Sequence, residues 1–69
     1  MRELYIKEGC PYCREQMKEL ERENLTYRLY NVGRDRSALE AARGKYGANM
    51  VPVLVEGGEV KSIGYRGKG

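Results

Sequence analysis

The pattern of apolar positions in the first half of the chain predicts a strand, a helix and a second strand. Residues 3–7 are rich in β-favouring side chains, and residues 25–32 alternate apolar with polar positions, so each range predicts a strand. Between them, residues 11–24 have the spacing of an amphipathic helix. Its apolar face is formed by Cys13, Met17 and Leu20. The two strands should therefore be parallel and joined by a right-handed crossover.

A second helix is predicted after a turn at residues 33–36. Either Asp35 or Ser37 can cap it, and Ser37 with Glu40 fits a capping box. Its buried face is expected at Leu39, Ala42 and Tyr46. Gly47 is suited to the left-handed position that ends a helix.

A β-hairpin is predicted at the end of the pattern. The pattern predicts strands at residues 53–56 and 59–63. Gly57-Gly58 between them suits a two-residue turn. The order β-α-β-α-β-β defines an α/β fold with a four-stranded mixed sheet. Residues 64–69 contain three glycines and no helical pattern, which predicts a flexible tail. With 69 residues, the whole range 1–69 forms a single domain.

Charge narrows the range of partners. The net charge is +3, but acidic residues interrupt every basic run. This pattern predicts a solvent-exposed surface of mixed charge rather than a nucleic-acid interface. The positive balance still favours anionic thiol substrates. No apolar run is long enough for a signal peptide or a membrane span, so we expect a cytoplasmic protein that binds no membrane. We also expect a monomer that binds no nucleic acid.

The chemistry of the chain is predicted at its only two cysteines. Cys10 directly precedes the first helix and Cys13 lies in its first turn, after Pro11, which is suited to that turn. The amides and the dipole at a helix start stabilise a thiolate, so the pKa of Cys10 should fall below that of a free thiol, and Lys7 adds positive charge nearby. Cys13 belongs to the apolar face and should keep its proton longer.

This difference predicts a division of labour. Cys10 attacks a substrate disulfide, and Cys13 then attacks Cys10 to release the reduced substrate. For a glutathione mixed disulfide, Cys10 alone suffices if a second glutathione completes the cycle. A Cys-x-x-Cys pair that opens a helix after a strand is typical of this redox chemistry.

Two other interpretations of the cysteine pair have less support than redox chemistry. A structural disulfide is improbable in a reducing compartment. A metal site needs about four ligands, and the chain offers two thiols and no histidine, so no metal ligand is assigned. A metal or iron–sulfur carrier that forms through dimerisation remains an alternative of another class.

Together these motifs resemble the glutaredoxins of the thioredoxin superfamily. The likeness rests on Leu-Tyr-Ile-Lys-Glu-Gly-Cys-Pro-Tyr-Cys at residues 4–13 and on Met-Val-Pro at residues 50–52 before the hairpin. It implies a thioredoxin-like fold without the family's terminal helix. It also implies reduction of protein disulfides and glutathione mixed disulfides, with glutathione as a co-substrate and no tightly bound cofactor.

The resemblance assigns further roles by position. It implies a cis peptide between Val51 and Pro52, which residues alone leave open between cis and trans. Lys7 would meet the glycine carboxylate of glutathione, Tyr12 would line the groove, and Val51 would pair with the cysteinyl backbone. The alternatives are a solvated lysine at Lys7 and packing against the helix end at Tyr12. Met50 stands where the family has threonine.

The end of the chain departs from the glutaredoxin pattern. The family's acidic segment that holds the γ-glutamyl group would begin at Gly64, but residues 64–68 read Gly-Tyr-Arg-Gly-Lys. Residues 62–66 are instead similar to the end of the redoxins that serve class Ib ribonucleotide reductase. That likeness implies thioredoxin reductase and ribonucleotide reductase as alternative partners. Tyr65 would then be a docking residue, or else a hydrophobic cover for the sheet edge.

Overall fold

A four-stranded mixed sheet forms the centre of the computed structural model, which describes residues 1–69. The sheet consists of β1 (Arg2–Ile6), β2 (Arg28–Asn31), β3 (Val53–Glu56) and β4 (Glu59–Ile63), in the spatial order β2-β1-β3-β4. β1 runs parallel to β2 and antiparallel to β3, and β3 and β4 form an antiparallel hairpin. The predicted element order, mixed sheet and hairpin are confirmed.

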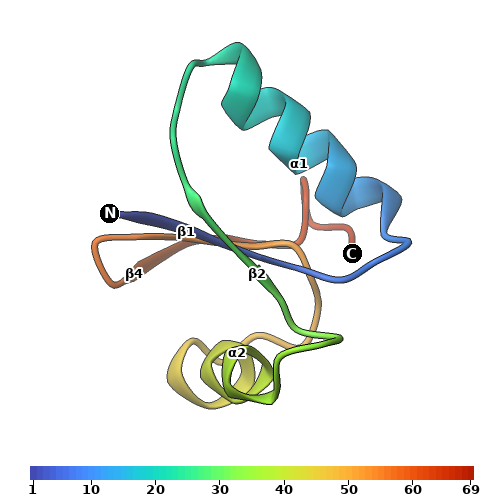
Figure 1. The fold of residues 1–69 in the computed structure, drawn as a ribbon, viewed down its shortest axis with the longest axis vertical. Helices are drawn as coiled ribbons and strands as arrows, with labels where there is room; N and C mark the ends of the chain where they lie inside the picture. Colours follow the sequence, from blue (N-terminus) through green and yellow to red (C-terminus); the bar gives the residue numbers. More distant parts are fainter.

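One helix lies on each face of the sheet (Figure 1). α1 (Pro11–Arg22) connects the parallel strands β1 and β2 across one face. α2 (Arg36–Glu40) lies on the opposite face and continues into a π-helical turn, η1 (Ala41–Lys45). A parallel strand pair needs a crossover of this kind, because a tight turn cannot return the chain to the same end of the sheet.

The core follows from the alternation of side chains along β1. Leu4 and Tyr5 are both buried, and successive strand residues point to opposite faces. Tyr5 belongs to the larger cluster on the α2 face, whose other buried members are Val32, Ala38, Ala42, Ala48, Val53 and Val55. Leu4 faces the other way, toward the side on which α1 buries Cys13 and Leu20.

Tyrosines supply the aromatic packing in a chain without Phe or Trp. The rings of Tyr5 and Tyr30 stack with their centroids 5.0 Å apart, and Tyr46 tilts against Tyr5 at 5.7 Å. Burial raises the pKa of Tyr5, with smaller contributions from Glu3 and Tyr46. Tyr5 therefore stays a neutral phenol inside the core at physiological pH.

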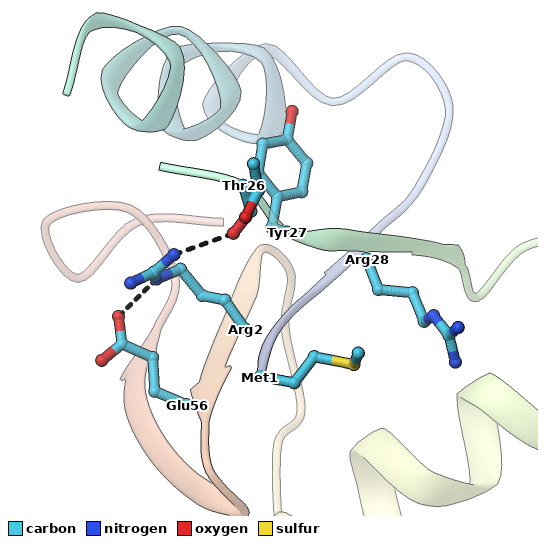
Figure 2. A pocket seen from close by; sticks show the side chains of 6 residues that line it. All are labelled: Met1, Arg2, Thr26, Tyr27, Arg28 and Glu56. Atoms are coloured by element: carbon cyan, nitrogen blue, oxygen red, sulfur yellow. Dashed lines mark hydrogen bonds and ion pairs between the residues drawn. The ribbon is translucent and has the colours of Figure 1, made fainter. Parts of the chain in front are cut away.

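β2 is shorter than the sequence predicts. The alternation over residues 25–32 predicts eight strand residues, but only Arg28–Asn31 pair with β1, starting at Glu3 opposite Arg28. Among the preceding residues, Thr26 bonds to the side chain of Arg2 instead. Its Nη1 donates to the carbonyl of Thr26 at 2.8 Å, and its Nε donates to Glu56 at 2.8 Å (Figure 2). β1 begins one residue earlier, at Arg2, which has no partner in β2.

α1 begins at Pro11 as predicted but ends earlier, at Arg22 rather than residue 24. Asn24 has a positive φ of 57°, which a continuing helix does not allow. The apolar face also differs from the prediction: Met17 is only half-buried, and Gln16 is buried beside Cys13 and Leu20.

α2 is capped by Asp35, whose Oδ1 accepts the amide of Ala38 at 3.2 Å. The capping box that Ser37 and Glu40 would form is therefore wrong. The predicted inner face is largely confirmed, with Ala42 buried and Leu39 and Tyr46 half-buried. The helix region is followed by Gly47 at φ +65°, as expected for the residue after a helix end.

No helix follows β4. Residues 64–69 turn back beside α1 (Figure 1), and Tyr65 and Lys68 exchange backbone hydrogen bonds of 2.6 and 3.0 Å. The flexibility predicted for this segment stays a prediction. None of the helices is long and apolar enough to cross a membrane.

Candidate active site

The loop between β1 and α1 places Cys10 at the start of the helix. Gly9 has φ +77°, a backbone angle that residues other than glycine rarely adopt. Cys10 is then the N-cap residue, with extended backbone angles, and Pro11 occupies the first helical position. The Sγ of Cys10 accepts the backbone amide of Cys13 at 3.2 Å. A sulfur thus takes the position of the usual capping oxygen, where it receives an amide that has no partner within the helix.

The two cysteines differ in exposure. Cys10 is partly exposed, whereas Cys13 is only 2% exposed, and the two thiols are free. Burial raises the pKa of Cys13 from its ordinary value near 9 to about 12, and the contact with the Cys10 side chain adds to this effect. Hydrogen bonding to the Lys7 backbone acts in the opposite direction. Cys13 is therefore a protonated thiol at neutral pH, and Cys10 is the sulfur that a substrate can reach.

A groove of about 570 Å³ lies at the carboxyl ends of β1 and β2. It brings together Lys7, Met50 and Val51, which the sequence assigned to substrate binding. The Val51-Pro52 peptide bond is cis, as the family resemblance implies, and Pro52 is fully buried next to the groove wall.

Gly64 lies against the same wall. Its amide donates to the carbonyl of Pro52 at 2.7 Å, and its φ is +80°. A Cβ atom there would lie 2.8 Å from the Sδ of Met50 and 2.9 Å from the carbonyl oxygen of Lys68. Only glycine fits this contact. Gly64 therefore packs closely against residues 50–52 and bonds to their backbone.

Two predicted binding residues lie elsewhere. Tyr12 is half-buried in the first turn of α1 and does not line the groove. The hydroxyl of Tyr65 donates to Glu19 of α1 at 3.4 Å, and Arg66 lies 4.0 Å from the same carboxylate. The half-buried ring of Tyr65 is therefore directed at the helix rather than at the groove.

The sequence interpretation missed the contribution of Arg43 to the groove. Arg43 lines it from η1, together with Leu39 and Ala42. The helical spacing could have predicted this position. Arg43 follows the predicted inward residue Leu39 by four residues, so the two lie on the same face of a helix. The ion pair between Glu8 and Arg34, at 2.8 Å, was also not predicted, because it joins two separate loops.

No group of three or more His, Cys, Asp or Glu side chains is arranged to hold a metal ion. Cys10 and Cys13 provide two sulfur ligands, fewer than a mononuclear site requires.

Comparison with known proteins identifies the family and the fold. The glutaredoxin family model matches residues 3–61. This chain belongs to the glutaredoxin family. Glutaredoxins are thiol–disulfide oxidoreductases, and the chain is assigned to that general class. No curated protein sequence matches it significantly.

Solved structures show the same fold. The thioredoxin-like protein BC3987 superimposes with a TM-score of 0.90 at 28% identity, over 94% of this chain and 88% of that protein. The glutaredoxin of Archaeoglobus fulgidus gives 0.80 at 23% identity, over 93% and 74%. The buckwheat glutaredoxin in complex with glutathione gives 0.78 at 22% identity, over 94% and 61%. The thioredoxin-like fold is thereby confirmed.

Proposed function

We propose that this glutaredoxin is a dithiol–disulfide oxidoreductase that reduces protein disulfides and glutathione mixed disulfides through Cys10 and Cys13. The observation that carries the proposal is the hydrogen bond from the Cys13 amide to the Cys10 sulfur at 3.2 Å. This bond, together with the helix dipole, stabilises negative charge on Cys10. The second sulfur is held one turn deeper and protonated.

The reaction transfers two electrons. The Cys10 thiolate attacks one sulfur of the substrate disulfide, forms a mixed disulfide and expels the other sulfur as a thiolate, which takes up a proton. Cys13 then loses its proton and attacks Cys10, forming the Cys10–Cys13 disulfide and releasing the second substrate thiol. The protein dithiol is oxidised and the substrate disulfide is reduced.

Glutathione is the proposed source of these electrons. Two glutathione molecules would reduce the Cys10–Cys13 disulfide and become one glutathione disulfide. The groove offers Lys7 for a carboxylate, and the backbone of Val51 offers a donor and an acceptor for an extended peptide. The buckwheat glutaredoxin, solved with glutathione bound, has the same fold.

A second electron source is favoured by the segment after β4. Residues 64–68 carry Arg66 and Lys68 and no carboxylate, so nothing in this segment can hold the ammonium of glutathione by charge. The alternative is a redoxin that thioredoxin reductase reduces and that passes electrons to ribonucleotide reductase.

A coupled assay that follows NADPH consumption tests both sources. One arm supplies glutathione with glutathione reductase, and the other supplies thioredoxin reductase. We expect turnover of a glutathione mixed disulfide in the first arm. Turnover in the second arm alone would replace glutathione by thioredoxin reductase, and a lack of turnover in both arms would contradict the oxidoreductase proposal.

A further inference from the structure

Residues 64–69, the strap, form a small hairpin that starts and ends on the same segment of the protein. At its base, the amide of Gly64 donates to the carbonyl of Pro52 at 2.7 Å. Backbone hydrogen bonds between Tyr65 and Lys68 close its turn, and the two residues between them have φ angles of 54° and 82°. A two-residue hairpin turn of type I′ requires positive φ at both of these positions. The strap therefore has a defined turn geometry.

The far end of the strap lies against Val51. A Cβ atom on Gly69 would lie 2.5 Å from the carbonyl oxygen of Val51 and 2.9 Å from the Cβ atom of Met50. Side chains do not approach other atoms this closely, so only the bare backbone of glycine fits there. The Cα atom of Gly69 is one bond away from that position, and Gly69 lines the groove. The backbone of Gly69 therefore covers the carbonyl of Val51.

Helix α1 holds the strap through Glu19 (Figure 1). Its Oε1 accepts the hydroxyl of Tyr65 at 3.4 Å, and the Nη2 of Arg66 lies 4.0 Å from the same oxygen. The guanidinium of Arg66 also lies over the Tyr65 ring, 5.4 Å from its centroid. These contacts are long, and the Arg66 side chain is 78% exposed, so each contact is weak. A competing ligand can therefore displace the strap.

The carbonyl of Val51 is also needed by the proposed reaction. An extended peptide that pairs with the backbone of Val51 donates an N–H group to this oxygen. The donor nitrogen must come within about 2.9 Å of it, in the space next to the carbonyl that Gly69 occupies. The closed strap and a strand-like substrate therefore exclude each other. A small disulfide without a peptide backbone needs only the partly exposed sulfur of Cys10.

We propose that the strap competes with extended peptide disulfides for the carbonyl of Val51, and that Glu19 determines how often the strap opens. The inference rests on the proposed thiol–disulfide exchange and adds a selection by substrate shape. Small disulfides react whether the strap is closed or open, whereas peptide disulfides react only when it is open. The apparent affinity for a peptide is reduced to the fraction of molecules that are open. Loosening the strap should therefore accelerate the peptide reaction alone.

Two reporter disulfides with the same leaving group test the proposal. One joins thionitrobenzoate to the cysteine of a blocked pentapeptide whose other residues are alanine, and the other joins it to mercaptoethanol. The Cys10 thiolate attacks the peptide or mercaptoethanol sulfur, forms a mixed disulfide with it and expels coloured thionitrobenzoate. Stopped-flow absorbance gives a second-order rate constant for each reporter. The ratio of the two constants cancels any change in the reactivity of Cys10 itself.

A matched pair of variants on α1 tests the role of Glu19. Glu19→Ala removes the acceptor that Tyr65 and Arg66 share. Glu23→Ala removes the same charge one turn further along, from an exposed residue outside these contacts. We expect Glu19→Ala to raise the ratio of the peptide rate to the mercaptoethanol rate roughly threefold, and Glu23→Ala to leave it unchanged. An equal rise in both variants would show a response to charge alone and would overturn the role of Glu19.

A third variant loosens the turn without removing a charged group. Gly67 has a φ of 82°, which alanine rarely adopts, and a Cβ atom there would have no neighbour within 4 Å. Gly67→Ala should therefore raise the same ratio. Amide hydrogen exchange, followed by NMR, reports strap opening directly, and the Lys68 amide should exchange faster in both Gly67→Ala and Glu19→Ala. Faster exchange with an unchanged ratio would overturn the competition between strap and substrate.

Failure of the strap proposal can be distinguished from failure of the proposed function. If the parent protein releases thionitrobenzoate from both reporters and no variant changes the ratio, the strap has no part in selection but the exchange chemistry stands. If neither reporter releases thionitrobenzoate above the uncatalysed rate, the exchange chemistry itself is contradicted.

Discussion

Two pockets lie at opposite ends of the sheet. The larger one is the less favourable place for a reaction. The pocket of about 680 Å³ at the start of β1 is lined by Arg2, Glu56 and neighbouring residues, yet Arg2 is held by Glu56 and by the carbonyl of Thr26 (Figure 2). The groove of about 570 Å³ at the other end is lined by Lys7 and Arg43, neither of which forms an ion pair, and Lys7 precedes Cys10 by three residues in the chain. Ligands of open α/β sheets bind at the carboxyl ends of the parallel strands, which is where the groove lies and where the larger pocket does not.

The largest difference between the two ends should appear on removal of the reacting sulfur. Cys10→Ser should reduce disulfide reduction to the background rate, since no other exposed thiol can take its place. A matched change at the other end, Arg28→Gln, should retain turnover in the same coupled assay. Full turnover by Cys10→Ser would show that the assigned roles are wrong.

The next largest effect separates the two sulfurs. Cys13→Ser should abolish the reduction of protein disulfides, because no second thiol can release the mixed disulfide. It should keep measurable turnover of a glutathione mixed disulfide, where external glutathione performs the release. Turnover numbers for both substrate types check this prediction, and equal losses would argue against a resolving role for Cys13.

A smaller effect is expected in the pH dependence of stability. The pKa of Cys13 is raised by burial to about 12, from an ordinary value near 9. Between these values the folded protein keeps a proton that the unfolded chain releases, so the free energy of unfolding should fall as pH rises from about 9 toward 12. Urea denaturation of the reduced protein measures this slope. It should become shallower in Cys13→Ser, while an unchanged slope would assign the loss to Tyr5 and Tyr27, whose pKa values are also raised.

The smallest effect is expected at the far pocket. The hydrogen bond from Arg2 lowers the pKa of the Glu56 carboxyl below its ordinary value near 4.5. The pair therefore contributes stability above that value and loses it as pH falls further. Arg2→Met should lower the melting temperature at neutral pH by only a few degrees and leave thiol exchange unchanged. Calorimetry at neutral and acidic pH checks this, because the difference between the variant and the parent protein should shrink in acid.

Helices and strands could be predicted where the residues within the element specify it. The hairpin at residues 53–63 was predicted at its observed bounds, since alternation and Gly57-Gly58 specify it without distant contacts. The bounds of β2 and the identity of the buried Gln16 could not be read in this way. The bounds of β2 depend on its pairing with β1, and the burial of Gln16 depends on how α1 lies over the sheet.

In the candidate site, too, the residues of a local motif were predicted, and a contact between distant segments was not. Cys10 and Cys13 follow from four consecutive residues, and the structure places them as the sequence suggests. Lys7, Met50 and Val51 meet in one groove, whereas Tyr65 contacts α1 through Glu19. That contact depends on how residues 64–69 turn back, which a segment with three glycines does not specify locally.

The different roles of the two thiols are tested by measuring the reactivity of each one separately. The reduced protein is treated briefly with limiting iodoacetamide at neutral pH and digested with trypsin, and tandem mass spectrometry of the fragment spanning residues 8–14 locates the label. We expect modification of Cys10 with Cys13 unlabelled, because one sulfur is reachable at the helix start and the other is buried and protonated. Equal labelling of both, or labelling of Cys13 first, would contradict these roles.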